Sequence, residues 1–94
     1  MSRSSAEVPT ANASRYLQQL CKHWSHKMHV EFDAEKGRIA FPNGTIAELA
    51  AREDALAVTL DVPDGEDAGR MRRVVAEHLD RFAFREAPLA FDWK

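Results

Sequence analysis

Two segments of the chain repeat apolar residues at the three-to-four-residue spacing of an amphipathic helix. At ~100° per residue, the apolar positions of 10–28 fall on one face, and so do those of 66–83. Thr10 stands where it caps the first helix, and Asp64 or Asp67 caps the second. Two helices are therefore predicted, and the residues on their core-facing stripes are Ala13, Leu17, Leu20, Cys21, Trp24 and Met28 in the first and Met71, Val74, Val75, His78, Leu79 and Phe82 in the second.

The rest of the chain alternates apolar and polar residues with a period of two, which is typical of strands with one buried face. Gly37 lies at the first hairpin turn and is available for a positive φ. Residues 45–52 fit a short helix, because Thr45 and Glu48 have the spacing of a capping box, and they also fit a strand. The strand is preferred because 38–62 then form one meander. The alternating apolar positions are Val30 and Phe32, Ile39 and Phe41, Leu56, Val58, Leu60 and Val62, and finally Leu89, Phe91 and Trp93.

These elements predict an α+β fold, a two-layer sandwich in the order α-β-β-β-β-α-β. The last strand is expected beside the first, which gives an antiparallel sheet of order 5-1-2-3-4 with two helices on one face. Trp93 should then be buried. Residues 1–9 are small and polar and end in Pro9, so they are expected to form a flexible tail, and 10–94 a single α+β domain.

Composition excludes several classes of protein. The chain has 94 residues, of which 45% are hydrophobic and 30% charged, as in one ordinary globular domain. A formal charge of -2 gives no bulk attraction for nucleic acid or an anionic membrane, so neither partner is expected. No apolar run approaches the ~18 residues that span a bilayer. The lone Cys21 forms no internal disulfide, and the start of the chain lacks the apolar run of a secretory signal, so a cytoplasmic location is expected.

Four runs of the sequence resemble a known family of small bacterial proteins, domain of unknown function 2218. The resemblance covers about residues 10 to 94. The family has no assigned activity or catalytic residues, and membership implies at most a link to siderophore and iron-uptake functions. The runs are RYLQQLCKHWSHK at 15–27, VEFD at 30–33, GRIAFP at 37–42 and EHLDRFAFRE at 77–86.

His78 is the most unusual member of the second apolar stripe. A polar group there needs a partner, or it costs ~1 to 3 kcal/mol. We predict that His78 is largely buried and bonded to a backbone carbonyl or to Tyr16. The alternative is that it lines a pocket between the helices that suits an anionic or aromatic ligand. The residues of this candidate site are Tyr16, His23, Trp24, His78, Arg81 and Arg85.

Histidines and a cysteine gather in 21–29, and both are common metal ligands. His23 and His26 are three residues apart on a helix and could share an ion, with His29 or His78 as a further ligand. Cys21 lies at the border of the apolar stripe and is interpreted as a small buried hydrophobe. Because neither Cys-x-x-Cys nor His-Glu-x-x-His spacing is present, no metal and no cofactor are predicted.

No catalytic triad, phosphate loop or nucleotide-binding fingerprint is present, so the sequence predicts a non-enzyme. The favoured hypothesis is an accessory or binding module that acts through a protein partner or a small ligand. A metal carrier using His23 and His26, and an enzyme with a site around His78, are the alternatives. The outer sheet face is a further candidate surface, and the chain is expected to be a monomer or a weak homodimer through it. Its predicted small residues are Ala40, Ala57 and Ala90, inside a rim of Glu31, Arg38, Thr59, Asp61 and Asp92.

Overall fold

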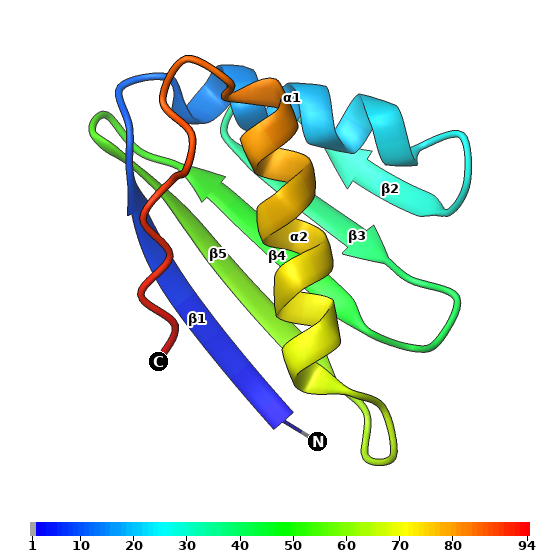
Figure 1. Cartoon of the computed structure of the whole chain (residues 1–94). Helices are drawn as coiled ribbons and strands as arrows, with labels where there is room; N and C mark the ends of the chain where they lie inside the picture. The colour runs from blue at the N-terminus through cyan, green and yellow to red at the C-terminus, as the bar shows by residue number, and fades with distance from the viewer. Residues whose placement is uncertain (1) are drawn as a thin grey trace.

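The computed structural model describes residues 2–94, which form five strands and two helices (Figure 1). The element order is β-α-β-β-β-β-α, so the predicted α+β sandwich is confirmed as a class, while its order differs at both ends. The elements are β1 (Ser2–Pro9), α1 (Ala13–Trp24), β2 (His29–Phe32), β3 (Lys36–Ala40), β4 (Ile46–Ala51), β5 (Ala55–Val62) and α2 (Ala68–Phe82).

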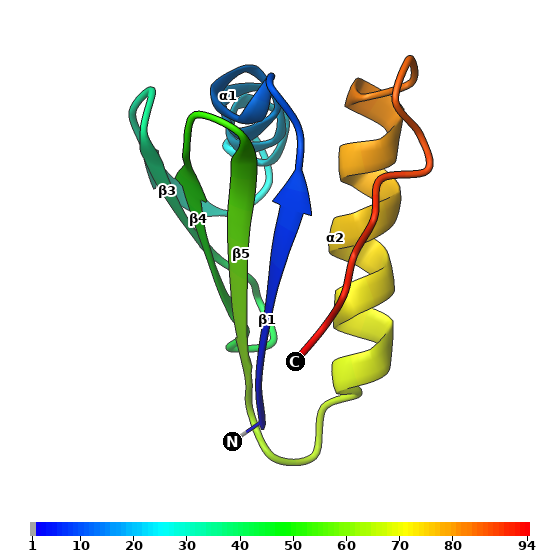
Figure 2. The same cartoon turned by 90° about the vertical axis from the view of Figure 1, so that its left-hand side faces the viewer.

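All strands pair antiparallel in one sheet of order β1-β5-β4-β3-β2. Both helices lie on the same side of this sheet, as predicted. Figure 2 shows α2 running along the sheet while α1 crosses the strands near one end. No element of residues 2–94 covers the opposite face of the sheet.

The core lies between the sheet and the two helices. Alternate residues of β5 are buried while those between them are half-buried, which is the period-two pattern of a strand with one covered face. The helix stripes supply the facing side. The largest fully buried side chains include Leu17, Leu20, Ile39, Leu56, Leu60, Leu79, Val8, Val58, Val62 and Val75.

Gly37 brings α1 close to β3. A Cβ atom on Gly37 would lie 2.7 Å from Cys21 Sγ and 3.4 Å from Leu17 Cδ2, so the helix packs where a side chain would otherwise stand. Gly37 does not adopt the positive φ that was open to it, because the only glycines of residues 2–94 with that conformation are Gly44 and Gly65. Gly37 is needed for close approach and not for its backbone freedom.

The prediction of a flexible tail at 1–9 is wrong for the described residues 2–9. These form β1, which pairs with β5 from Ser2↔Val62 to Pro9↔Ala55. Ser4, Ala6 and Val8 are buried and the residues between them are exposed. The alternation is therefore present in the sequence, but its inward residues are small. Pairing is favoured because β5 would otherwise leave an apolar strand at the edge of the sheet.

The C-terminal segment is not the predicted fifth strand of the sheet. It runs along the free edge of β1, where the backbone of Lys94 and Ser5 exchange two hydrogen bonds of 3.1 and 2.8 Å. Leu89 is buried, whereas Trp93 is only half-buried and stacks on Phe91 with ring centroids 5.6 Å apart. The predicted order 5-1-2-3-4 is thus wrong where it places the C-terminal segment in the sheet beside β2. The meander itself is confirmed, including a strand at 46–51.

The close packing at Gly37 generates a stability prediction. Gly37→Ala should lower the free energy of unfolding by about 1–3 kcal/mol, because its methyl group overlaps Cys21 Sγ. In a Cys21→Ala background the same substitution should cost at least ~1 kcal/mol less, since the overlapping atom is gone. Urea unfolding of the two single variants and the double variant measures this. Additive effects would contradict the contact.

Candidate functional site

An aromatic cluster joins the C-terminal end of α1 to α2. The Trp24 ring lies 4.9 Å from the His78 ring and 5.0 Å, edge-on, from that of Phe41. The His23 ring lies 5.8 Å from those of both His78 and Phe82. Of the predicted site, the structure therefore brings together His23, Trp24 and His78.

His78 is half-buried at the margin of this cluster. Its Nδ1 lies 2.7 Å from the carbonyl oxygen of Val74, so the predicted bond to a backbone carbonyl is confirmed. The ring is less buried than predicted, because only Trp24 and His23 pack over it where the two helices cross.

An apolar groove of about 400 Å³ opens beside the cluster. It lies between the end of α1, the turn after β3 and the first turns of α2. Its volume falls in the range of small-molecule sites. The apolar lining residues are Trp24, Met28, Phe41, Pro42, Met71 and Val74, and the polar ones are Asn43, Glu66, Asp67 and Arg70.

The polar rim of the groove is partly engaged within the chain. Asn43 Nδ2 donates to Glu66 Oε1 at 2.9 Å, and Asp67 caps α2 by accepting from the backbone N–H of Arg70 at 3.0 Å. Asp67 is thus confirmed as the cap of α2, one of the two capping residues that the sequence predicted for it. Within residues 2–94 the Arg70 guanidinium makes no ion pair, and the indole N–H of the buried Trp24 makes no hydrogen bond. Two donors of the groove are thus unused.

Tyr16 and Arg85 lie in a different hollow, of about 470 Å³, at the other end of α1. There the Tyr16 hydroxyl donates to the Glu86 carboxylate, which also accepts from Thr10 Oγ1 at 2.9 Å and Asn12 Nδ2 at 3.1 Å. The predicted cap at Thr10 is wrong, because α1 begins at Ala13 with Asn12 in the N-cap position. Thr10 instead ties the C-terminal segment to the start of α1.

The predicted six-residue pocket is therefore divided. Arg81 is exposed on α2 and shares neither hollow. The physical reason is the crossing of the helices in Figure 1, which lets only short stretches of α1 and α2 meet. The sequence missed Phe41 and Glu86, since their roles depend on which distant elements meet.

The hydrogen bonds shift the acidities of the Tyr16–Glu86 pair. The Tyr16 hydroxyl, followed by Asn12, lowers the pKa of Glu86, and the bond to Glu86 together with burial raises the pKa of Tyr16. The pair is therefore a neutral donor on a charged acceptor over a wide pH range.

Cys21 and the histidines do not converge. Burial raises the pKa of the Cys21 thiol to about 11, so the thiol is protonated at neutral pH. Cys21 packs against β3 and is the small buried residue that the sequence indicated. His26 is exposed. Within residues 2–94 no three histidine, cysteine or acidic side chains lie where they could hold one ion.

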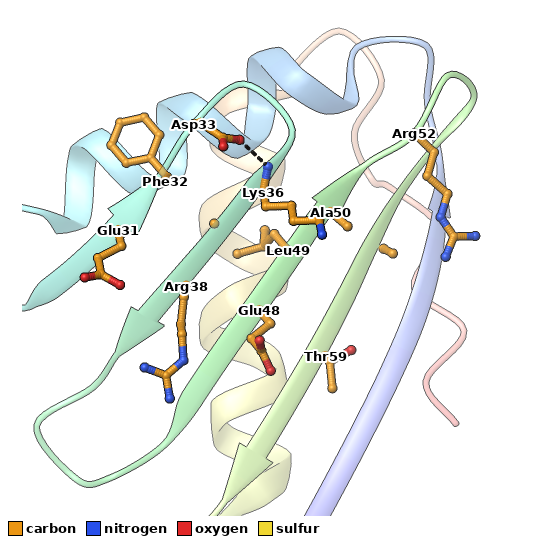
Figure 3. A pocket seen from close by; sticks show the side chains of 12 residues that line it. Glu31, Phe32, Asp33, Lys36, Arg38, Glu48, Leu49, Ala50, Arg52 and Thr59 are labelled. Atoms are coloured by element: carbon orange, nitrogen blue, oxygen red, sulfur yellow. Dashed lines mark hydrogen bonds between the residues drawn. The ribbon is translucent and has the colours of Figure 1, made fainter.

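The uncovered face of the sheet carries a shallow trough of about 630 Å³ (Figure 3). Arg38, Glu48 and Lys36 rise from β3 and β4 on this side, and small residues form the floor. Ala40 and Ala57 lie on this face as predicted, whereas Ala90 belongs to the C-terminal segment outside the sheet. Ala50 lies beside Ala57 in the floor of the trough, and Ile46 pairs with Ala40 on the same face outside it.

The family model described as "Uncharacterized protein conserved in bacteria (DUF2218)" matches residues 5–94. The chain belongs to this family. It is also similar to the NMR structure of PA4090 from Pseudomonas aeruginosa, at 40% identity over 100% of this chain and 96% of that one, with a TM-score of 0.81.

The resemblance inferred from the sequence is thus confirmed, and DUF2218 membership brings no assigned activity with it. No curated protein matches the chain. Neither the description of the family nor that of PA4090 names iron, a siderophore or a metal, so the link to iron uptake stays a prediction. Within residues 2–94 no helix is long and apolar enough to cross a membrane.

The Tyr16–Glu86 bond predicts a pH-dependent contribution to stability. Because the pKa of Glu86 is lowered in the folded state, its contribution is present above the ordinary carboxyl value of ~4.3 and is lost as pH falls through the lowered one. Tyr16→Phe should cost about 1 kcal/mol near neutral pH, with a smaller difference from the natural protein below about pH 4. Chemical unfolding at several pH values measures both, with Glu86→Gln as a control that lacks the titration. Parallel curves between about pH 7 and 3 would show that the bond contributes nothing.

The absence of converging ligands in the described residues bears on the metal hypothesis. We expect purified protein to contain zinc, iron and copper well below one ion per chain, because His23 and His26 find no third ligand. Elemental analysis measures this. About one ion per chain, lost in His23→Ala/His26→Ala, would instead establish the metal carrier.

Proposed function

We propose that this domain is a non-catalytic binding module whose groove beside Trp24 holds a small, flat, largely apolar molecule with a hydrogen-bond acceptor. The observation that carries the proposal is the state of Trp24. Trp24 is 3% exposed and lines the groove, while its N–H has no hydrogen-bond partner within residues 2–94 and still reaches solvent. Buried tryptophans usually find such a partner, and a ligand acceptor in the groove would supply it.

The remaining walls favour an aromatic ligand. Met28 and Met71 offer thioether groups, which adapt to irregular shapes and make favourable contacts with ring edges. Phe41 and Pro42 add flat apolar surface on the opposite side. Arg70 at the rim supplies a cation, which suits an acidic group or the face of a ring.

The groups nearest to the groove support binding and not catalysis. His78 has its Nδ1 bonded to the Val74 carbonyl, so this nitrogen is not free to exchange protons with a ligand. Cys21 keeps its proton and faces the sheet. Covalent catalysis requires a nucleophile and a base within hydrogen-bond reach of each other. The described residues that line the groove include no such pair.

Two flat probes of similar size test the proposal. Quinoline carries a ring-nitrogen acceptor, whereas indole carries only a donor. At about ten heavy atoms, quinoline should bind with a Kd of about 1 mM or tighter. In amide-proton NMR spectra we expect it to shift the Trp24 indole signal and leave that of Trp93, which lies beside β1, unchanged. Indole should bind at least about fivefold more weakly, since it leaves the Trp24 donor unpaired.

A groove-filling variant provides the control. Val74→Trp should occupy the groove and weaken quinoline binding at least about tenfold. Arg73→Trp adds the same bulk at an exposed position of α2 and should leave binding unchanged. The proposal fails if quinoline leaves the Trp24 signal unmoved, or if Val74→Trp binds quinoline as the natural protein does.

A further inference from the structure

The uncovered face of the sheet is arranged in three cross-strand rows that its hydrogen-bonding register fixes. Antiparallel pairing sets each residue directly opposite its partner, so the side chains of one row project side by side. From β2 toward β1, the rows are His29, Ala40, Ile46, Asp61 and Arg3; then Glu31, Arg38, Glu48, Thr59 and Ser5; and, from β3, Lys36, Ala50, Ala57 and Glu7.

Charges at the margins of this face are paired within the chain. Arg3 lies 3.7 Å from Asp61. Arg52 lies 2.7 Å from Glu7. On the β2 edge, His29 Nε2 lies 3.6 Å from Glu31 Oε1, a contact that is an ion pair only when the imidazole is protonated.

The central charges are not paired. Arg38 and Glu48 are direct cross-strand partners, yet within residues 2–94 neither they nor Lys36 form an ion pair. In Figure 3 their side chains project away from the sheet. The centre of the face thus presents one anion and two cations among apolar side chains, namely Ala40, Ile46, Ala50 and Ala57.

We propose that this face binds a second copy of the same chain, with the two sheets stacked face to face about a two-fold axis that runs along the strands between β3 and β4. Such an axis places each residue of β3 over the residue of β4 in the same row of the second copy. Arg38 then faces Glu48 of the second copy, and Glu48 faces its Arg38. Ala40 faces Ile46, and the Lys36 stem lies over Ala50.

The outer strands also match about this axis. β2 lies over β5 of the second copy, so that His29 faces Asp61 and Glu31 faces Thr59. No like charges meet in any of the three rows. Among axes that run along the strands, one along β3 sets Arg38 against Arg38, and one along β4 sets Glu48 against Glu48. An axis between β4 and β5 sets Arg38 over Ser5 and Glu48 over Thr59 and so pairs neither charge. The axis between β3 and β4 is therefore the one along the strands that pairs both central charges.

The dimensions suit a weak dimer. Stacked sheets lie ~10 Å apart, a gap that an arginine and a glutamate span together. Because the face has few apolar residues, the interface belongs to the transient class, and its charge pairs are screened by salt. The groove beside Trp24 lies on the helix side of the sheet and stays open, so this proposal is independent of the proposed ligand.

A charge-swap experiment tests the arrangement. Sedimentation equilibrium at low salt and about 0.02–1 mM protein, the range for small interfaces, should show self-association. R38E sets Glu against Glu in both contacts of the dimer, and E48R sets Arg against Arg, so each variant alone should raise the Kd at least about tenfold. An equimolar mixture of the two pairs Glu with Arg at both contacts and should recover the natural affinity within about threefold.

Recovery in the mixture separates this interface from an effect inside one chain, because mixing cannot relieve repulsion within a chain. R73E and E77R make the same charge changes on the exposed side of α2 and should leave association unchanged. Melting curves verify that each variant is folded. If R38E or E48R does not fold, Ala50→Arg takes its place, because it sets Arg against Lys36 of the second copy and should weaken association in the same way. A natural protein that stays monomeric throughout, or a mixture that fails to recover, overturns the proposal.

Discussion

The close contact between α1 and β3 at Gly37 fixes the positions of most other elements. With no side chain at Gly37, Cys21 and Leu17 pack directly against the sheet. This contact sets the distance between α1 and the sheet, and therefore the position of the Trp24 ring above the sheet. Trp24 then reaches both Phe41 and His78. A helix held further from β3 would separate these three rings, and the groove between them would lose a wall.

Local patterns in the sequence were sufficient to predict the helices, the meander and the face on which the helices lie. Each depends on contacts within one element or between neighbours along the chain. The Asp67 cap and the strand at 46–51 belong to this group. So does the bond from His78 to the Val74 carbonyl, because the two residues are one helical turn apart. The resemblance to the family agreed with the predicted elements and added no catalytic or binding residues.

Apart from the conformation of Gly37 and the start of α1, the errors involve partners far apart in the sequence. β1 pairs with β5 across more than forty intervening residues, and its inward positions are small, so its hydrophobic pattern is weak. Glu86 reaches back to Tyr16 and Thr10 through a segment without regular structure. The crossing of α1 and α2 decides which halves of the two stripes meet, and periodicity along a single helix carries no information on that angle. The six-residue pocket was divided for this reason.

The two candidate surfaces are coupled through the register of the sheet. Gly37 and Ile39 must face the helices, so Arg38 is placed on the opposite side by the period of the strand. Pairing with β4 then sets Glu48 beside Arg38 and Leu49 beside Gly37. A slip of one residue in either strand would bury a charge and expose a core side chain, at a cost far above that of any surface contact. The packing that holds α1 on the sheet thus also fixes the charge pattern on the uncovered face.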